Sequence, residues 1–510
     1  MNPALASLTA RKSGVWISLH LAWGFALGQS ISKYGLGVST DAAHYMFAGL
    51  NLADGRGLTL FGGAPYAQWP PLYPAALAGI HALSGWDMLA AAQALQWWTW
   101  LLLSLCISIL CLRIFPQRFW LALSAALLAQ SGTVMIFAFQ SAGSDYLHLL
   151  FVLLFVWQAG DYMRAPGTSS LAGMLLFAAL GTLTRYTGLT LLIMGALILV
   201  WKPGGSLWRR LARGLWMGLA ALPSALWYLA VFNERGQGRP PISLVENVRT
   251  FTLSILGWWM PVPDSKPAQF FWILLFWLAF ALAVSFFTRR PRDARRMNEY
   301  SMALLGYGFL YAATLFVVAR LAYFNKLSDR FLLPLYIPMI VFLLLCIETF
   351  MTGTRRGANT RLVLGGAAVA LISLPLLFFA YRAITQAQAR GVAAGNLFNT
   401  SAWHENSALR YWKEHPPQGD FIVYANSPAG VAFHTWEDIL ASPRKFAGPF
   451  SDVQLPMPAD LIPPGAQAYL IWIEPDAYSH LYTRAEINRA FQLIPLYEGA
   501  DGGVYRLAPR

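Results

Sequence analysis

Residues 39–74 read STDAAHYMFAGLNLADGRGLTLFGGAPYAQWPPLYP, and this stretch decides how the chain is interpreted. It follows the first apolar segment and places Asp41 a few residues beyond the end of that segment. Two glycine-rich turns and a rigid aromatic WPPLYP sequence at residues 69–74 complete it. A long loop with few charges beside an apolar segment is typical of a functional element rather than of a simple connection.

The composition is that of a polytopic membrane protein. Of the 510 residues, 57% are hydrophobic and only 12% are charged, whereas soluble domains carry about 25% charged residues. The net charge of +13 does not indicate a nucleic-acid partner, because residues 1–382 hold 28 basic and 12 acidic side chains while residues 383–510 hold 9 and 12. The positive excess therefore belongs to the membrane part, where cytoplasmic loops are expected to be basic.

Hydropathy windows of about 19 residues predict eleven membrane spans. They fall near residues 14–34, 89–112, 118–140, 146–163, 169–185, 187–201, 210–232, 269–288, 300–322, 331–351 and 361–381. The loops on one side carry 17 basic residues, so the positive-inside rule predicts a cytoplasmic N-terminus and a C-terminal tail outside. Eight of the twelve acidic residues before residue 383 then fall on the outer side, where we expect any chemistry.

The tail differs in character from the membrane part. Its runs FIVY at residues 421–424 and YLIWI at residues 469–473 are too short to cross a bilayer and suit buried strands, and residues 401–415 have a helical pattern. We therefore predict a transmembrane module over residues 1–382, with a long first outer loop at 36–88, and a small soluble extracytoplasmic α/β domain over 383–510.

Asp41 and Asp145 are the candidate catalytic carboxylates. Asp41 lies near the start of a short predicted helix, where it is either a helix N-cap or a general base for an acceptor hydroxyl. Asp145 begins the fourth span, where it is either a cap together with Ser144 or a second carboxylate that faces Asp41 across an outer cavity. The cap and the functional role are compatible at both positions.

Three cations on the predicted outer side are candidate ligands for a lipid phosphate. Arg185 lies where two short spans meet, and Lys326 and Arg330 lie at the outer start of the tenth span, against the positive-inside trend. The alternative for each is an interfacial side chain that extends to water. A cation at a break between short helices is also how a membrane protein can meet a phosphate.

Aromatic side chains of the first outer loop are the candidate substrate contacts. They are His44, Tyr45, Tyr66, Trp69 and Tyr73. The histidines of the chain are too scattered for metal-ligand spacing, and the three cysteines lie inside apolar runs without a zinc pattern. No metal site is predicted from the residues, and no nucleotide-binding motif is present.

These residues resemble a known family, the GT-C glycosyltransferases, and within it the protein mannosyltransferase and aminoarabinose-transferase type. The resemblance rests on Asp41 with Tyr45, GRG at residues 55–57 and PPLYP at residues 70–74. Asp145 resembles the second acidic position of that family, and DRFLLP at residues 329–334 resembles its later Arg-Tyr-Leu-Leu-Pro pattern, here with Phe for Tyr. The similarity covers the membrane part of the chain.

The resemblance implies a GT-C fold and a polyprenyl-phosphate-linked sugar as donor, bound from the outer side of a bacterial inner membrane. Asp41 would be the base that activates an acceptor hydroxyl or amine, with inversion at the anomeric carbon. Arg185, Lys326 and Arg330 would stabilise the departing lipid phosphate. Some members use a divalent metal and others do not, and with Asp145 as the only evident partner of Asp41 we expect no obligatory metal. The acceptor is not identified.

Two other functional classes stay open. A transporter or flippase of a lipid-linked sugar would suit eleven spans, but its charged residues should line a path at the membrane midplane, whereas the acids here gather at one face. A non-catalytic assembly protein would use the outer tail to bind a partner. Transport gives no evident reason for the long first outer loop.

Overall fold

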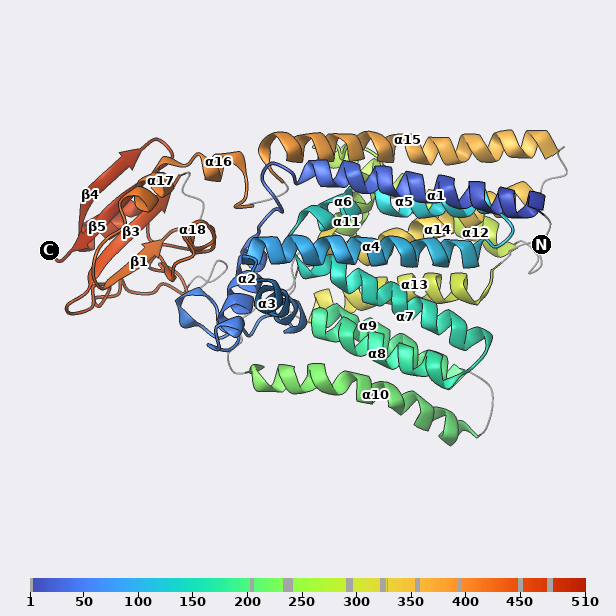
Figure 1. Cartoon of the computed structure of the whole chain (residues 1–510), viewed down its shortest axis with the longest axis horizontal. Helices are drawn as coiled ribbons and strands as arrows, with labels where there is room; N and C mark the ends of the chain where they lie inside the picture. The colour runs from blue at the N-terminus through green and yellow to red at the C-terminus, as the bar shows by residue number, and fades with distance from the viewer. Residues whose placement is uncertain are drawn as a thin grey trace.

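The structure, a computed structural model, describes residues 3–201, 206–232, 242–289, 297–321, 327, 329–353, 358–392, 397–447, 453–474 and 480–510. It consists of a bundle of long helices with a small sheet domain at one end (Figure 1). The N-terminus lies at the opposite end of the bundle from the sheet domain (Figure 1). We call the end of the bundle next to the sheet domain its domain end.

Each of the eleven expected spans corresponds to a helix or to a bent pair of helices. They are α1 (Pro3–Ser30), α4 (Met88–Ile114), α5 (Phe119–Ser131) with α6 (Thr133–Gln140), α7 (Ser144–Arg164), α8 (Thr168–Thr184), α9 (Leu189–Trp201), α10 (Leu207–Ala230), α12 (Lys266–Arg289), α13 (Glu299–Leu321), α14 (Asp329–Gly353) and α15 (Ala358–Arg390). A further helix, α11 (Leu244–Gly257), precedes α12.

Not all of these helices are long and apolar enough to cross a membrane. Within the described ranges six of them are, namely α4, α7, α12, α13, α14 and α15, and the pair of α5 and α6 makes a seventh if it counts as one span. The other helices differ from the expectation for physical reasons. Helices α8 and α9 have only 17 and 13 residues, and the first turns of α10 carry three arginines.

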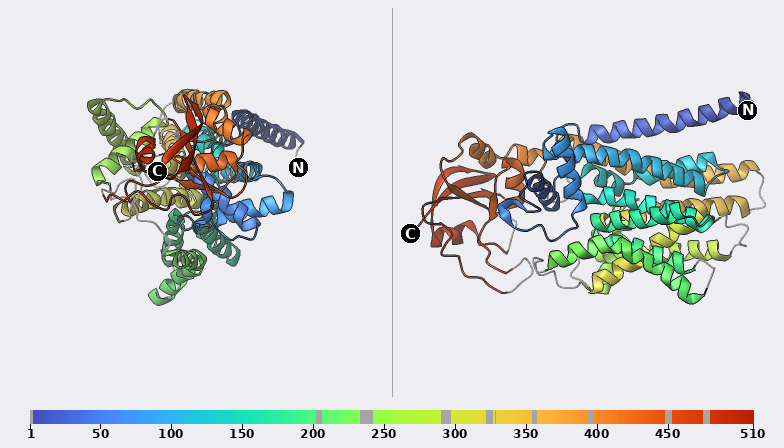
Figure 2. Two further views of the ribbon diagram at one scale, coloured as in Figure 1. Left: turned by 90° about the vertical axis from the view of Figure 1, so that its left-hand side faces the viewer. Right: turned by 60° about the horizontal axis from the view of Figure 1, so that its bottom comes forward.

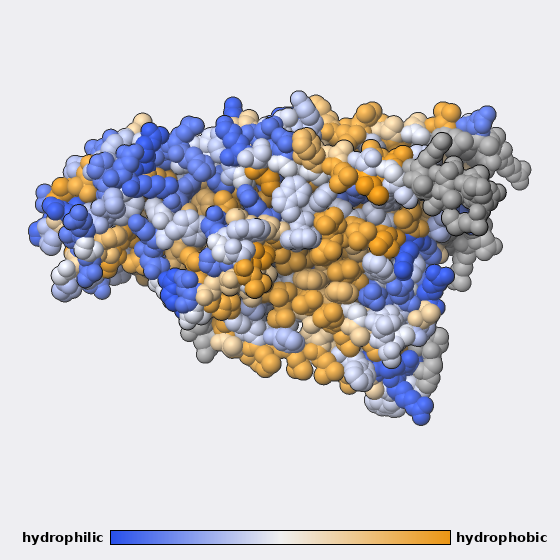
Figure 3. Space-filling view, in the orientation of Figure 1, coloured by the Kyte–Doolittle hydropathy of each residue, from blue (hydrophilic) through white to orange (hydrophobic). Residues whose placement is uncertain are grey.

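The surface of the bundle is apolar and that of the sheet domain is mostly polar (Figure 3). Helix α12 shows the apolar character best, since Phe270, Leu274 and Leu278 are all exposed. Helices α7 and α14 are mainly buried inside the bundle. The fold therefore confirms the polytopic membrane protein that the composition predicts. Helices α7 and α14 lie in its interior.

The bend between α5 and α6 lies against Tyr336 of α14. The two helices meet at Gly132 at an angle of 55°, and a Cβ atom at Gly132 would overlap the ring of Tyr336 on α14. The Tyr336 hydroxyl donates to the Leu128 carbonyl of α5 at 2.8 Å. A carbonyl near the end of a helix needs a partner from outside it, and Tyr336 supplies one.

The first loop of the bundle is folded rather than open. It forms α2 (Thr40–Ala53), the short 3-10 helix η1 (Phe61–Gly63) and α3 (Leu72–Ser84). Helices α2 and α3 lie between the bundle and the sheet domain (Figures 1 and 2). They also lie close together, because a Cβ atom at Gly49 of α2 would be 3.1 Å from the Pro74 carbonyl oxygen of α3.

The tail forms a five-stranded sheet with strand order β2-β1-β3-β5-β4. Its strands are β1 (Phe421–Ala425), β2 (Ile439–Ala441), β3 (Gln467–Ile473), β4 (Gln492–Gly499) and β5 (Gly502–Ala508). Strands β2, β1 and β3 are parallel, and β5 and β4 complete the sheet antiparallel. The two predicted strands are thus found as β1 and β3. Helix α15 continues past the expected domain boundary at residue 383 to Arg390.

Alternation along β1 and β3 gives the sheet two buried faces. Val423 pairs with Tyr469 in register, and both belong to the cluster on one face together with residues of α17 (Ser407–Glu414) and α18 (Pro428–Thr435). Tyr424 and Leu470 belong to the cluster on the other face with residues of α19 (Arg484–Ala490). The predicted helix over residues 401–415 is divided into α16 (Ser401–His404) and α17.

Candidate active site

Asp41 lies in the first turn of α2, at the domain end of the bundle. The N-cap of this helix is Ser39, whose side chain accepts a hydrogen bond from the Ala42 amide at 3.2 Å. Because Ser39 performs the capping, the Asp41 carboxylate is directed elsewhere. It pairs with Arg330, the second residue of α14, with 2.5 Å between Arg330 Nη1 and Asp41 Oδ2.

Arg330 joins Asp41 to Asp145, the second residue of α7. Arg330 Nε lies 2.9 Å from Asp145 Oδ2, and Arg185 Nη1 lies 2.6 Å from Asp145 Oδ1. The side chains of Asp145 and Arg185 are only 12% and 14% exposed, so these charges are largely removed from water. Two carboxylates and two guanidinium groups from four separate elements therefore form one chain of ion pairs, which we call the charge cluster.

Ser144 links the charge cluster to the aromatic residues of the first loop. Arg185 Nη1 lies 3.4 Å from Ser144 Oγ, which in turn lies 3.4 Å from the Tyr45 hydroxyl. The sequence interpretation treated Ser144 only as a cap. In the structure its side chain accepts from Arg185 and donates to Tyr45, and an uncharged serine gives no advance sign of such a role.

Tyr45 is the centre of an aromatic group beneath the charge cluster. Its ring centroid lies 5.2 Å from that of Tyr73, 5.6 Å from that of Trp69 and 6.3 Å from that of Tyr66. Tyr45, Tyr66 and Tyr73 are at most 1% exposed. Burial, with a smaller effect of the Asp41 charge, raises the pKa of Tyr45 to about 12. The three tyrosines thus support α2 as neutral packing groups here, and their direct contact with a substrate stays a prediction.

His44 and Trp69 lie on the more open side of this aromatic group. The His44 ring stacks on Phe61 of η1 at 5.2 Å and lies 5.3 Å from Trp69. Burial lowers the pKa of His44 to about 4, against the opposing effect of the Asp41 charge. The imidazole is therefore neutral at neutral pH, and it cannot supply a proton as an imidazolium there.

The chain is similar to known proteins in its fold rather than in its sequence. Neither a protein-family model nor a curated protein sequence matches the chain. In structure it is similar to ArnT from Cupriavidus metallidurans in the apo state, with a TM-score of 0.63 and 12% sequence identity over 97% of this chain and 98% of that one. The chain has the fold of the GT-C glycosyltransferases.

Two further structures of the GT-C fold are similar to the chain. ArnT from Cupriavidus metallidurans bound to undecaprenyl phosphate has a TM-score of 0.63 at 11% identity, over 97% of each chain. The oligosaccharyltransferase from Archaeoglobus fulgidus in complex with zinc and sulfate has a TM-score of 0.49 at 11% identity, over 97% of this chain and 73% of that one. At these identities the comparison concerns the fold.

Two expectations about this site concern groups beyond the charge cluster. Lys326 lies outside the described residues, so only Arg185 and Arg330 of the three predicted cations are placed. Within the described residues no group of three or more His, Cys, Asp or Glu side chains is arranged to hold a metal ion. The carboxylates of Asp41 and Asp145 instead face guanidinium groups.

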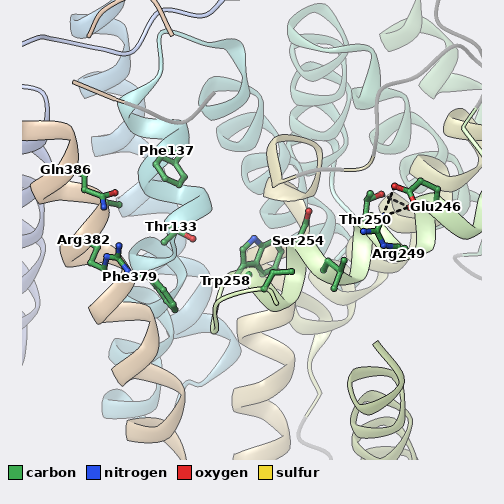
Figure 4. Close-up of a pocket in the computed structure, with 14 residues that line it drawn as sticks. Thr133, Phe137, Glu246, Arg249, Thr250, Ser254, Trp258, Phe379, Arg382 and Gln386 are labelled. Carbon is green, nitrogen blue, oxygen red and sulfur yellow. Dashed lines mark hydrogen bonds and ion pairs between the residues drawn. The ribbon is translucent and has the colours of Figure 1, made fainter. Parts of the chain in front are cut away.

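A groove separate from the charge cluster runs between α11 and α15 of the GT-C bundle (Figure 4). It encloses about 590 Å³. Arg382 and Gln386 face it from α15, Phe137 from α6, and Ser254 and Trp258 from α11 and the residue that follows it (Figure 4). The sequence interpretation did not predict this groove, because its walls come from three elements distant in the chain.

The groove changes from apolar to polar along α15. An adjoining hollow is lined by Leu371, Leu374 and Phe378 and shares Arg382 with the groove. Residues 371, 374, 378 and 382 repeat at intervals of three and four, so they lie on one side of the helix. Arg249 on the opposite wall is paired with Glu246 at 2.9 Å, whereas no carboxylate partner of Arg382 lies among the described residues.

Proposed function

We propose that the chain is a glycosyltransferase that moves a sugar from a polyprenyl-phosphate donor to an acceptor on the outer face of a bacterial inner membrane. The observation that carries the proposal is the charge cluster at the domain end of the bundle, in which Asp41 pairs with Arg330 and Asp145 holds Arg330 and Arg185 together. A base beside two cations is what inverting transfer from a phosphate requires. The GT-C fold supports the same assignment.

In the proposed reaction the Asp41 carboxylate takes a proton from the acceptor hydroxyl or amine. The acceptor atom attacks the anomeric carbon from the face opposite the phosphate, and the bond between that carbon and the phosphate oxygen breaks with inversion. The departing polyprenyl phosphate gains one negative charge. Arg330 and Arg185 would stabilise that charge, because guanidinium groups bind phosphate oxygens in a fixed two-pronged geometry.

Arg330 has a second role in this proposal. In the structure its guanidinium holds the Asp41 carboxylate at 2.5 Å. When the donor phosphate takes over the guanidinium, the Asp41 carboxylate is released from this ion pair and its oxygens are free to accept the proton of the acceptor. Binding of the donor would therefore expose the base to the acceptor.

The groove between α11 and α15 fits the lipid part of such a donor. A polyprenyl phosphate combines a long apolar chain with an anionic head. The lining of the hollow that adjoins the groove changes in the same order along α15, from the apolar Leu371 and Leu374 to the cationic Arg382. At 1.5 Å per residue the distance from Leu371 to Arg382 is about 16 Å along the helix axis. We assign to this groove the docking of the prenyl chain as the donor approaches.

The test of the proposed reaction is Asp41→Asn in purified protein, assayed with a panel of polyprenyl-phosphate sugars. We expect the rate of transfer to fall by roughly 10²- to 10⁴-fold, the usual contribution of a general base. The matched control is Asp54→Asn, which removes a carboxylate from the end of the same helix, where Asp54 forms an exposed ion pair with Arg56. Asp54→Asn should leave the transfer rate unchanged.

Two results would contradict the proposal in different ways. Full transfer by Asp41→Asn would overturn the assignment of the base. A wild-type protein that transfers no sugar from any polyprenyl phosphate, but moves a lipid-linked sugar across the bilayer of a vesicle, would instead favour the flippase.

A further inference from the structure

The segment of residues 34–38, just before α2, pairs through its backbone with the link between α6 and α7. The Gly37 amide donates to the Gln140 carbonyl at 2.7 Å, and the Ala142 amide donates to the Gly37 carbonyl at 3.0 Å. Asp41 follows Gly37 by four residues, and Asp145 follows Ala142 by three. This pairing therefore fixes the backbone on which the two carboxylates of the charge cluster are mounted.

The opposite edge of the same segment is held by the start of the C-terminal domain. The Phe398 amide donates to the Val38 carbonyl at 2.8 Å. The side-chain amide of Asn399 donates to the Leu36 carbonyl at 2.9 Å and also to the Tyr34 carbonyl. Asn399 is 1% exposed, so these hydrogen bonds do not compete with bulk water.

The orientation of the Asn399 side chain is determined by its partners. The Tyr34 and Leu36 carbonyl oxygens are acceptors, so they must face the donor of the side chain, its amide nitrogen. The side-chain oxygen Oδ1 therefore faces the other way. There it lies 2.7 Å from His404 Nε2, which therefore carries a proton and donates. His434 Nε2 lies 2.7 Å from the Phe398 carbonyl and donates to it in the same manner. Both histidines belong to helices of the C-terminal domain.

The middle of α2 and the following η1 are attached to the same domain. The ring of Phe47 stacks on Trp436 at 5.3 Å, and the Gly62 amide, in η1, donates to Asp438 Oδ1 at 3.0 Å. Because α2 is held at Phe47, a displacement of residues 34–38 after loss of the Asn399 hydrogen bonds would tilt the first turn of α2 and move Asp41.

We propose that Asn399 is a positioning residue, through which the C-terminal domain sets the place of Asp41 relative to Asp145 and Arg330. The inference rests on the proposed function, since it assigns the domain a part in the same reaction. Asn399 itself touches none of the four charged side chains in its described hydrogen bonds. It acts on the backbone segment that leads into α2.

The experiment uses Asn399→Asp, which keeps the size of the side chain but replaces the donor by a carboxylate that faces two carbonyl oxygens. A misplacement of about 1 Å at reacting groups can cost on the order of 100-fold in rate. We expect kcat for sugar transfer to fall at least about tenfold, with KM for the lipid donor changed less than about twofold, because the lipid contacts lie elsewhere.

The matched control is Asn406→Asp in the same domain. Asn406 is also buried, donates to the Asp501 carbonyl at 2.9 Å and caps α17. Aspartate is an equally good cap, and no described hydrogen bond of Asn406 reaches residues 34–38. Asn406→Asp should therefore keep kcat near that of the wild type.

Hydrogen exchange supplies a readout that does not need activity. Amides of residues 34–43 should exchange faster in Asn399→Asp than in wild type or Asn406→Asp, while the amides of β1 and β3 stay protected in all three. Unchanged kcat in Asn399→Asp, or an equal loss in both variants, would overturn the positioning role. A wild-type protein without transfer activity would contradict the proposed function alone, and the exchange pattern would still decide about Asn399.

Discussion

At the scale of single residues, the charge cluster is asymmetric. Among the described residues, Asp145 accepts from both Arg185 and Arg330, whereas Asp41 accepts from Arg330 alone. Asp145 and Arg185 are also the more buried pair, at 12% and 14% exposure, compared with 27% for Asp41. This asymmetry separates the structural part of the cluster from the part that is free to react.

Asp145→Asn should therefore destabilise the fold more than Asp41→Asn. Removing one partner of a buried ion pair costs about 3–5 kcal/mol, because a charge is left without a counter-charge. After Asp41→Asn, Arg330 still has Asp145, so we expect a loss of about 1 kcal/mol or less, as for partly exposed pairs. The measurement is denaturant or thermal unfolding in lipid nanodiscs.

A double variant provides the control for this prediction. Arg185→Gln combined with Asp145→Asn removes both charges, and it should recover part of the stability that Asp145→Asn loses. Equal destabilisation by Asp145→Asn and Asp41→Asn would show that the cluster is not divided in this way.

The four charged residues could be named from the sequence because a charge next to an apolar run is rare and therefore visible. Their pairing could not be named, because it joins residues 41, 145, 185 and 330 through the packing of four elements. Ser144 and Asn399 carry no charge and interrupt no pattern. Their importance depends wholly on which polar atoms the fold brings next to them.

At the scale of elements, the groove between α11 and α15 makes a prediction about substrate binding. If Arg382 receives the donor phosphate as the lipid docks, Arg382→Gln should raise KM for the lipid donor about three- to tenfold with kcat unchanged, since docking precedes the chemical step and Arg382 takes no part in that step. Steady-state kinetics over a range of donor concentrations measure both constants.

Arg390→Gln is the matched control, since Arg390 is exposed in the last turn of the same helix and does not line the groove. It should leave KM as in the wild type. A rise in KM of equal size in both variants would indicate a general loss of attraction to anionic lipids, and would remove the case for a specific role of the groove.

Elements were predicted unevenly from the sequence. Long apolar runs specify helices, and the short runs of β1 and β3 specify buried strands, because both patterns are strong and local. Strand β4 was missed because all of its residues are exposed or half-buried, so that no fully buried position reveals an alternation. The bend at Gly132 was missed because its cause, the Tyr336 ring, lies some 200 residues away in sequence.

At the scale of the whole molecule, the junction between the C-terminal domain and the bundle should be sensitive to acid. Burial lowers the pKa of His434 to about 4, below the ordinary value of about 6.5. Between these two pH values the unfolded chain binds a proton at this site and the folded chain does not. Stability is therefore unaffected above about pH 7 and falls as the pH drops from about 6.5 to about 4.

The expected loss reaches up to about 3 kcal/mol at pH 4, from about 1.4 kcal/mol for each unit of pKa. Hydrogen exchange of the amides of β1 and β3, corrected for the intrinsic effect of pH, measures it. His434→Gln should be less stable than the wild type at neutral pH but should show a weaker dependence on pH. The same pH dependence in both proteins would assign the effect to other groups.

Phe47 has a consequence for how the protein is made. This residue of α2 is 4% exposed and belongs to the apolar core of the C-terminal domain, whose strands are synthesised more than 370 residues later. The Phe47 ring packs on Phe61 and on Trp436, each at 5.3 Å, so part of it stays uncovered in a nascent chain until Trp436 has been synthesised. A product that is cut short before α18 lacks this cover, so premature termination would yield a protein that quality control can recognise by that exposed ring.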